Sequence, residues 1–91
     1  MARLSDAEIE THAPSVPGWS RKGDTIEKLY TFDDFAGSMQ FVNRVAQLAE
    51  EMDHHPDILV QYSRVTLTLS SHDAGGLTER DFRLAGRIDA K

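Results

Sequence analysis

Three of the four histidines in this 91-residue chain stand in or after one short stretch, Glu50 to Pro56. His54 and His55 are adjacent there, and His72 follows further along the chain. Histidine is the one side chain whose ordinary pKa, about 6.5, makes both protonation states available near neutral pH. Three histidines at one site could divide proton donation, proton acceptance and ligand binding among them. This residue set therefore predicts acid/base chemistry.

The positions of His54 and His72 indicate how each could work. Glu50 precedes His54 by one helical turn, and the negative end of a helix finishing near His54 would lie beside its ring. Both interactions favour the protonated imidazole, so we lean towards His54 as the proton donor. If the strand before His72 continues past Ser70, His72 points away from that strand's apolar row and is available to a ligand.

Asp81 has two interpretations that its spacing alone supports equally. It would be the third residue of a helix capped by Thr78, where a carboxylate can accept from the cap amide. It could also belong to the histidine site. A zinc site made from His54 or His55, His72 and a carboxylate is the alternative chemistry. Adjacent histidines rarely point at one metal, and the stretch lacks His-x-x-x-His and cysteine spacing, so we predict a metal-free site.

The elements that position these residues follow from the apolar periodicity and the capping residues. Helices are predicted at about 5–12, 35–53 and from 78 onward, and strands at 16–21, 25–32, 58–62 and 65–70. The order is αββαββα. We therefore predict one α+β domain over residues 1–91, with a four-stranded antiparallel sheet and three helices packed on one face.

Single residues and pairs outside the histidine set add four expectations. Pro56 disfavours helical geometry at His55, so the helix should end at His54 and the two rings should point in different directions. Tyr62 is expected to fill space at a strand end. The pair Ser63-Arg64 matches the positive φ of a tight turn poorly, which leaves the turn type open. Trp19 is expected to be a core or sheet-face aromatic, with stacking on a ligand as the lesser alternative.

The long central helix carries two neighbouring apolar stripes, which together cover about half of its circumference at 100° per residue. The first stripe is Phe35, Met39, Val42, Ala46 and Ala49, and the second is Phe41, Val45, Leu48 and Met52. We expect the first stripe to face the core. In so small a domain, we interpret the second as a surface for self-association rather than as further core.

Composition excludes several classes of function. The net charge of −5 and the few clustered basic residues argue against direct nucleic-acid binding. Without cysteine, the chain has no disulfide framework and no thiol nucleophile. The N-terminus is unlike a signal peptide and no apolar run has the length of a membrane span, so we expect a cytoplasmic protein without membrane contact.

The histidines also belong to a longer pattern. After Glu50 come three residues, His54-His55-Pro56, five residues, Tyr62, nine residues, His72, eight residues and Asp81. This pattern closely resembles the signature of the pterin-4a-carbinolamine dehydratase family. The resemblance reaches Gly18-Trp19, residues 41–46, 67–70 and 76–81, and so covers nearly the whole chain.

The resemblance implies dehydration of 4a-hydroxytetrahydropterin to quinonoid dihydropterin, which recycles the pterin cofactor of aromatic amino acid hydroxylases. It implies no further cofactor, since the pterin is the substrate. On this basis His54 and His72 form the acid/base pair, His55 orients the pterin, and Asp81 and Glu50 support binding. It also implies the same α+β architecture and a homodimer or homotetramer built by pairing sheets and long helices.

Two other functions remain open beside this one. Animal members of the family also bind a homeodomain transcription factor, so the chain could be a dimerisation module that uses its long-helix surface. A pure adaptor has no physical need for the intact histidine set, which favours the enzyme. A related role in another pterin pathway is the third possibility.

Overall fold

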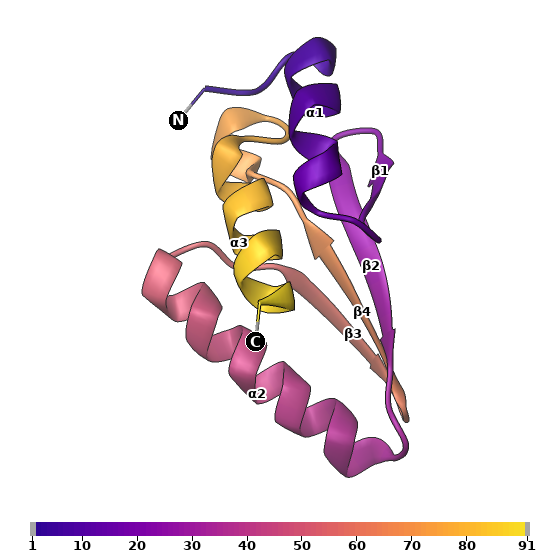
Figure 1. Cartoon of the computed structure of the whole chain (residues 1–91). Helices are drawn as coiled ribbons and strands as arrows, with labels where there is room; N and C mark the ends of the chain where they lie inside the picture. Colours follow the sequence, from indigo (N-terminus) through magenta and orange to yellow (C-terminus); the bar gives the residue numbers. More distant parts are fainter. Residues whose placement is uncertain (1, 91) are drawn as a thin grey trace.

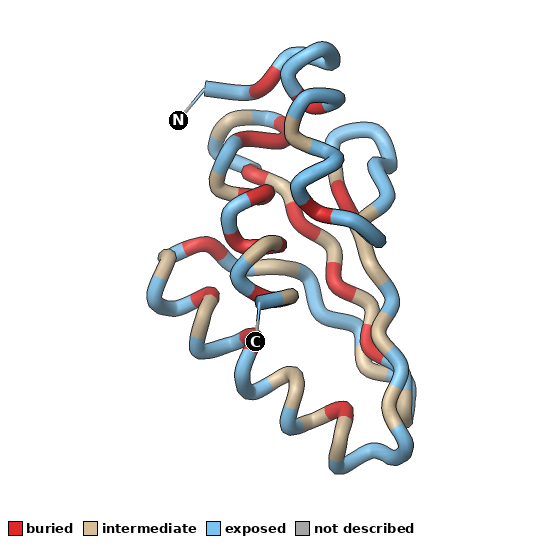
Figure 2. Tube along the Cα trace, viewed as in Figure 1, coloured by how far each residue is buried: buried red, intermediate tan, exposed pale blue. Residues whose placement is uncertain are grey.

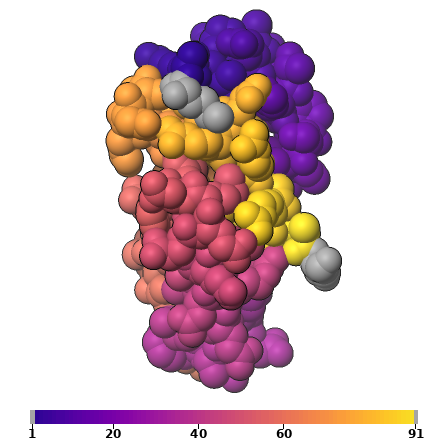
Figure 3. Space-filling view, turned by 90° about the vertical axis from the view of Figure 1, so that its left-hand side faces the viewer, coloured from indigo at the N-terminus to yellow at the C-terminus, as the bar shows by residue number. Residues whose placement is uncertain are grey.

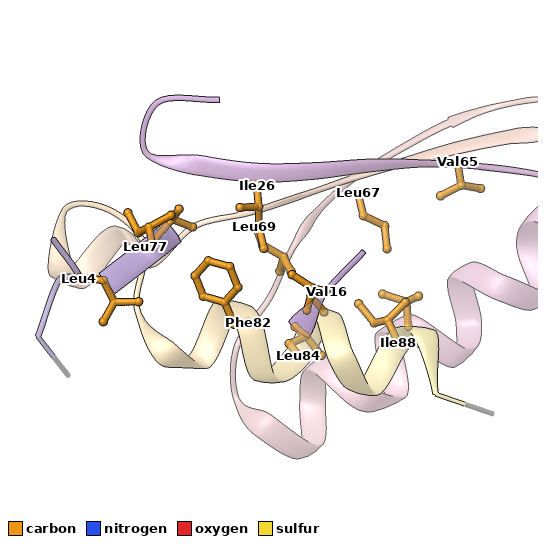
Figure 4. Close-up of a cluster of buried hydrophobic side chains, with 13 residues drawn as sticks. Leu4, Val16, Ile26, Val65, Leu67, Leu69, Leu77, Phe82, Leu84 and Ile88 are labelled. Carbon is orange, nitrogen blue, oxygen red and sulfur yellow. The ribbon is translucent and has the colours of Figure 1, made fainter. Parts of the chain in front are cut away.

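The computed structural model describes residues 2–90 as an α+β domain (Figure 1). Its elements are α1 (Asp6–His12), the 3₁₀ turn η1 (Ala13–Ser15), β1 (Ser20–Lys22), β2 (Thr25–Thr31), α2 (Phe35–Met52), β3 (Asp57–Gln61), β4 (Arg64–Leu69), the 3₁₀ turn η2 (His72–Ala74) and α3 (Glu79–Asp89). The four strands are antiparallel in the order β1-β2-β4-β3. The helices lie on one side of the sheet (Figures 1 and 4). The predicted fold class and element order are confirmed.

The core lies between this sheet and α3, as Figure 4 shows. In β4, every second side chain points inwards, and Val65, Leu67 and Leu69 are fully buried. Leu84 and Ile88 of α3 pack from the opposite side. Burying each side chain of this size stabilises the fold by roughly 1.5–3 kcal/mol. The core therefore fixes α3 on β4, and with it the position of Asp81 near the start of that helix.

The helix starts follow the predicted capping chemistry. At α1, the Ser5 hydroxyl accepts from the Glu8 amide at 3.2 Å and the Glu8 carboxylate accepts from the Ser5 amide at 2.9 Å. Thr78 and Asp81 form the same box at α3. The predicted strand at 16–21 is shorter than expected and begins at Ser20. Gly18 has a φ of 89°, which turns the chain before β1 can start.

Our assignment of the second stripe on α2 to self-association is wrong, whereas Val42 and Ala49 of the first stripe do face the core. Val45, assigned to the self-association stripe, is fully buried inside the domain, and Phe41, Leu48 and Met52 pack against the same core. The first residue of the expected core stripe, Phe35, is 51% exposed. The physical reason is that α2 packs against α3 as well as the sheet, so a single chain covers a wider arc than one interface would (Figures 1 and 2).

The turn between β3 and β4 corrects a second expectation. Gln61 pairs with Arg64, so the turn residues are Tyr62 and Ser63 rather than Ser63 and Arg64. Tyr62 takes the positive φ, 53°, that such a turn requires. Tyr62 is 67% exposed, so it does not fill space at the end of the strand as expected.

Within residues 2–90, no helix is both long and apolar enough to cross a lipid bilayer.

Candidate active site

The end of α2 decides where the adjacent histidines point. The helix ends at Met52, two residues before the predicted end, because Asp53 adopts the left-handed conformation with φ 49°. The Asp53 amide donates to the Glu50 carbonyl at 3.2 Å, and the His54 amide donates to the Ala49 carbonyl at 3.0 Å. This pair of hydrogen bonds is a Schellman motif. It reverses the chain and turns His54 back towards α3.

His54 contacts Asp81, and both residues are buried. Nε2 of His54 lies 2.6 Å from Oδ1 of Asp81, with the two residues 6% and 0% exposed. Oδ2 of Asp81 accepts from the Ser71 hydroxyl and from the Thr78 amide, each at 2.9 Å. An ionised carboxylate only accepts hydrogen bonds, so Nε2 of His54 carries a proton and donates it to Asp81. Nδ1 is the ring nitrogen left for a ligand.

This contact combines the two interpretations of Asp81 that its spacing left open. One carboxylate caps α3 and orients a histidine of the site at the same time. Ser71, which contacts both Asp81 and the Thr78 hydroxyl, is a supporting residue that the sequence did not identify.

Glu50 contacts a different histidine from the one that we expected. Its Oε2 lies 2.5 Å from Nε2 of His55, and both side chains are exposed. The expected pairing of Glu50 with His54 is therefore wrong. The left-handed residue Asp53 takes His54 off the face of the helix, so helical spacing no longer applies beyond Met52. His55 lies before Pro56 outside the helix, as predicted.

His72 reaches the site from the segment that follows β4. β4 ends at Leu69, and His72 begins the short turn η2. This turn is closed at its base by an isolated bridge between Ser71 and Gly76. The His72 side chain is exposed, and no hydrogen bond within residues 2–90 involves its ring nitrogens. It is the least constrained of the three histidines.

These side chains surround one pocket of about 340 Å³. The pocket is lined by Asp53, His54, His55, Ser70, His72, Asp73 and Arg80. In Figure 3, the end of α2 and the segment after β4, which are far apart in the sequence, border each other on one face. The structure thus brings the three predicted histidines together, with Asp81 directly behind His54 and Glu50 on His55. Asp73 and Arg80 were not predicted to belong to the site.

A larger pocket of about 420 Å³ lies elsewhere, against aromatic rings of β2 and α2. Asp89 beside it accepts hydrogen bonds from Trp19, Lys28 and Tyr30. Burial would raise the pKa of Asp89, but hydrogen bonds from Tyr30, Lys28 and Trp19 outweigh burial and hold it below its usual value. Burial and the bond to Asp89 raise the pKa of Tyr30. Asp89 is already bonded to Trp19, Lys28 and Tyr30, so these polar groups serve one another rather than a ligand. The smaller histidine pocket is therefore the better reaction site.

Trp19 has a structural role in this arrangement, because its indole nitrogen donates to Asp89 at 2.9 Å. Trp19 also packs against the core, as predicted, and it is not among the residues that line the histidine pocket. His12, which we did not place in the site, stacks on Phe82 with ring centroids 5.3 Å apart. Over the described residues 2–90, no group of three or more histidine and acidic side chains is arranged to hold a metal ion.

Two similar proteins match this chain over nearly its whole length. A protein of Thermomicrobium roseum, provisionally named pterin-4-alpha-carbinolamine dehydratase, is 53% identical over 97% of this chain and 95% of its own length. A protein of Koribacter versatilis with the same provisional name is 52% identical over 94% of this chain and 92% of its own.

Two solved structures share the fold. A transcriptional coactivator/pterin dehydratase from Brucella melitensis has a TM-score of 0.91 at 31% identity, over 96% of this chain and 95% of that one. A pterin dehydratase-like protein, identified as a RuBisCO assembly factor in the alpha-carboxysome, has a TM-score of 0.63 at 28% identity, over 78% and 82%. The family model for pterin 4 alpha carbinolamine dehydratase matches residues 2–91, and with these relatives it shows that the chain belongs to that family.

Proposed function

We propose that this protein dehydrates 4a-hydroxytetrahydropterin to quinonoid dihydropterin and water. The observation that carries the proposal is the convergence of His54, His55 and His72 on one pocket, with the buried carboxylate of Asp81 behind His54. Family membership supports the same reaction class, because the relatives' names specify a pterin carbinolamine dehydratase. The pterin is the substrate, and the reaction as proposed uses no further cofactor.

The chemistry matches what the residues can supply. The bond between C4a and its hydroxyl oxygen breaks while the N5 lone pair forms the N5–C4a double bond. A donor must protonate the departing hydroxyl so that it leaves as water, and an acceptor must take the proton from N5. One proton is given and one is taken, so the enzyme returns to its starting state once the two groups exchange a proton through solvent. Two histidines on opposite sides of a pterin could perform these transfers.

The structure supports a division of labour among the histidines. His54 and His72 are the proposed acid/base pair, and His55, held by Glu50, orients the pterin. A histidine whose Nε2–H is held by a buried carboxylate is well placed to accept a proton at Nδ1, because the carboxylate stabilises the resulting imidazolium. This geometry favours His54 as the acceptor from N5. His72, exposed at the pocket, would then protonate the hydroxyl.

The sequence favoured His54 as the proton donor partly because of Glu50. In the structure, Glu50 contacts His55 instead. The remaining argument, the negative end of α2, is weaker because the chain reverses at Asp53 before reaching His54. We therefore assign the donor role to His72 in this proposal. Recycling of the pterin cofactor of an aromatic amino acid hydroxylase is the metabolic role that we propose for the reaction.

The test is a direct assay of carbinolamine dehydration with purified protein, following the rate above the spontaneous reaction. We expect turnover by the wild type and by His12→Ala, whose ring stacks on Phe82 away from the pocket. His72→Ala should lose most of the enzymatic rate. If the wild type does not exceed the spontaneous rate at micromolar concentration, the proposed reaction is wrong.

A second candidate function is that of an interaction module, alone or alongside catalysis. Leu29 and Leu59 are both opposite Thr66 on the outer sheet face, and they are 52% and 54% exposed. β3 is also an edge strand of the sheet, and an edge offers unpaired backbone groups to a partner. The Brucella relative is described as a transcriptional coactivator as well as a dehydratase. We propose that this sheet surface mediates homodimer or homotetramer formation, rather than the second apolar stripe of α2, which contains Val45.

A further inference from the structure

An ion pair between Arg80 and Asp73 lies at the edge of the histidine pocket, and both residues line it. Nη2 of Arg80 donates to both carboxylate oxygens of Asp73, at 2.8 and 2.9 Å. The hydrogen bond from the Arg80 guanidinium holds the pKa of the Asp73 carboxyl below its usual value. Asp73 belongs to the turn η2, and Arg80 belongs to the first turn of α3. The pair therefore ties η2 to α3.

The residue that this connection affects most is His72, which directly precedes Asp73. His54 and His55 are each oriented by a carboxylate, but no hydrogen bond in the described part of the chain involves the His72 ring nitrogens. The direction of the His72 ring consequently depends on the backbone of its turn. At the base of that turn, the Ser71 amide donates to the Gly76 carbonyl at 2.9 Å. Towards its tip, the turn is tied to α3 through Asp73 and Arg80.

Two features of Arg80 are unfavourable for the stability of the fold, which indicates that this residue has another role. A cation in the first turn of a helix is repelled by the positive end of the helix dipole. The Nε atom of Arg80 is also buried and has no hydrogen-bond partner among residues 2–90. A buried donor without a partner is uncommon in folded proteins and requires an explanation. Fixing the side chain so that Nη2 reaches Asp73 is such an explanation.

We propose that Arg80 is a positioning residue that, through Asp73, holds the turn carrying His72 against the pocket. Its effect on rate rests on the proposed dehydration, whereas its effect on the His72 ring does not. Proton transfer requires hydrogen-bond distance between His72 and the departing hydroxyl. A displacement of about 1 Å in such a group can lower the rate by up to about 100-fold.

The test compares Arg80→Gln, Asp73→Asn and the double variant. Each single change should lower kcat for carbinolamine dehydration by roughly 10- to 100-fold with a smaller change in KM. The double variant should be no slower than the worse single one, because both changes break the same connection. The matched control is Arg87→Gln, which breaks a comparable 2.8 Å pair with Glu51 that does not line the pocket. It should leave kcat unchanged.

A second measurement is independent of turnover. NMR signals of the three imidazoles, assigned with histidine-to-alanine variants, should show the His72 ring shifted or broadened in both single variants and unchanged in Arg87→Gln. The His54 ring should keep its signals, since Asp81 still holds it. Arg80→Lys should recover part of kcat, because one ammonium group can bond both carboxylate oxygens as the single Nη2 does.

These results separate the two proposals. If the wild type does not dehydrate the carbinolamine but the His72 signals respond as described, the proposed function fails and the positioning role stands. If the wild type is active while Asp73→Asn and Arg80→Gln both retain kcat within about two-fold, the positioning role is wrong. Asp73 is an exposed residue, so Asp73→Asn tests the connection even if a change at Arg80 prevents folding.

Discussion

Nε2 of His54 lies 2.6 Å from Oδ1 of Asp81, joining the segment after α2 to the first turn of α3 across 27 residues of sequence. Asp81 is fully buried and accepts two further hydrogen bonds, from Ser71 and the Thr78 amide. The same carboxylate therefore caps a helix, orders the loop after β4 and fixes the protonated nitrogen of a pocket histidine. Stability and the proposed catalysis depend here on one side chain.

Asp81→Asn should damage both properties. An amide accepts at only one of its two atoms, so it cannot take both the Nε2–H of His54 and the Thr78 amide. His54 would keep its contact only in the other tautomer, protonated at Nδ1, which removes the proton acceptor from the pocket. We expect a loss of about 1–3 kcal/mol in the free energy of unfolding, the usual cost of one unsatisfied buried group. We also expect kcat to fall by roughly 10²- to 10⁴-fold, as for loss of a proton-transfer group. Thermal melts and steady-state kinetics measure the two effects.

The control for this change is Asp24→Asn, at an exposed carboxylate that pairs with Arg3. It should leave kcat unaltered and shift the melting temperature little, since exposed ion pairs contribute about 0–1 kcal/mol. An Asp81→Asn variant that melts and turns over like Asp24→Asn would contradict the dual role of Asp81.

The three histidines should not be equivalent. His54→Ala and His72→Ala remove proton-transfer groups, so each should lower kcat by about 10²- to 10⁴-fold. His55→Ala should raise KM with a smaller change in kcat, because it weakens ground-state and transition-state contacts together. The double variant of His54 and His72 should fall no further than the spontaneous rate. Circular dichroism checks each fold first, and a His55→Ala variant that loses the most kcat would contradict these roles.

The proposed reaction needs no metal, because the N5 lone pair of the substrate already drives loss of the hydroxyl. Exhaustive dialysis against a chelator should therefore leave kcat unchanged. Re-addition of zinc should not increase it. Turnover that disappears with chelation and returns with zinc would favour the zinc site built from the histidines and a carboxylate, and would contradict acid/base catalysis by His54 and His72 alone.

Asp89 should make stability depend on pH in the acid range. Although burial opposes it, the hydrogen bonds from Tyr30, Lys28 and Trp19 give Asp89 a pKa below its usual value in the folded state. A depressed pKa contributes stability that is fully present above the unfolded value, about 3.9, and is lost as pH falls through the lower folded value. Melting temperatures of Asp89→Asn should therefore fall less than those of the wild type between about pH 5 and pH 2.

The matched comparison is Asp33→Asn, at an exposed carboxylate before α2 that makes no side-chain hydrogen bond within residues 2–90. Its pH dependence should follow that of the wild type. If Asp89→Asn and the wild type lose stability in parallel below pH 5, the three hydrogen bonds to Asp89 do not supply the expected linkage.

Self-association should depend on the sheet rather than on Val45. Val45→Glu would bury an unpaired carboxylate in the core and should unfold the domain, so it cannot report on assembly. Leu59→Lys changes an exposed residue of the edge strand β3, where a lysine opposes strand pairing. We expect an oligomer for the wild type and a folded, smaller species for Leu59→Lys in analytical ultracentrifugation at micromolar concentration. An unchanged oligomer in the variant would exclude this surface.

Much of the architecture follows from local pattern. The alternation of Val65, Leu67 and Leu69 with threonines has period two and fits only a strand with one buried face, and β4 is that strand. The capping boxes at Ser5 and Thr78 identify the residue at which each of two helices begins. In each box, the cap residue and the third helical residue accept from each other's backbone amides. The histidine set was found in the same way, from residue type and spacing.

The stripes on α2 could not be assigned from the sequence. Periodicity shows that both are apolar, but which neighbour covers each depends on how α3 packs beside α2. Val45 is therefore buried within one chain, although its spacing is equally compatible with an interface between chains. The exposure of Tyr62 has a similar origin, since the register of β3 on β4 decided which residues form the turn.

At the site, the sequence by itself determined which side chains are present, and tertiary structure decided their partners. Spacing along a helix paired Glu50 with His54, but one left-handed residue, Asp53, ends the helix two residues earlier and sends His54 to Asp81. The connection from Arg80 to His72 also had no local signal, because it joins a turn and a helix that meet only when α3 packs on β4. Local propensities specify elements, whereas contacts between distant segments arise from the packing of a shared core.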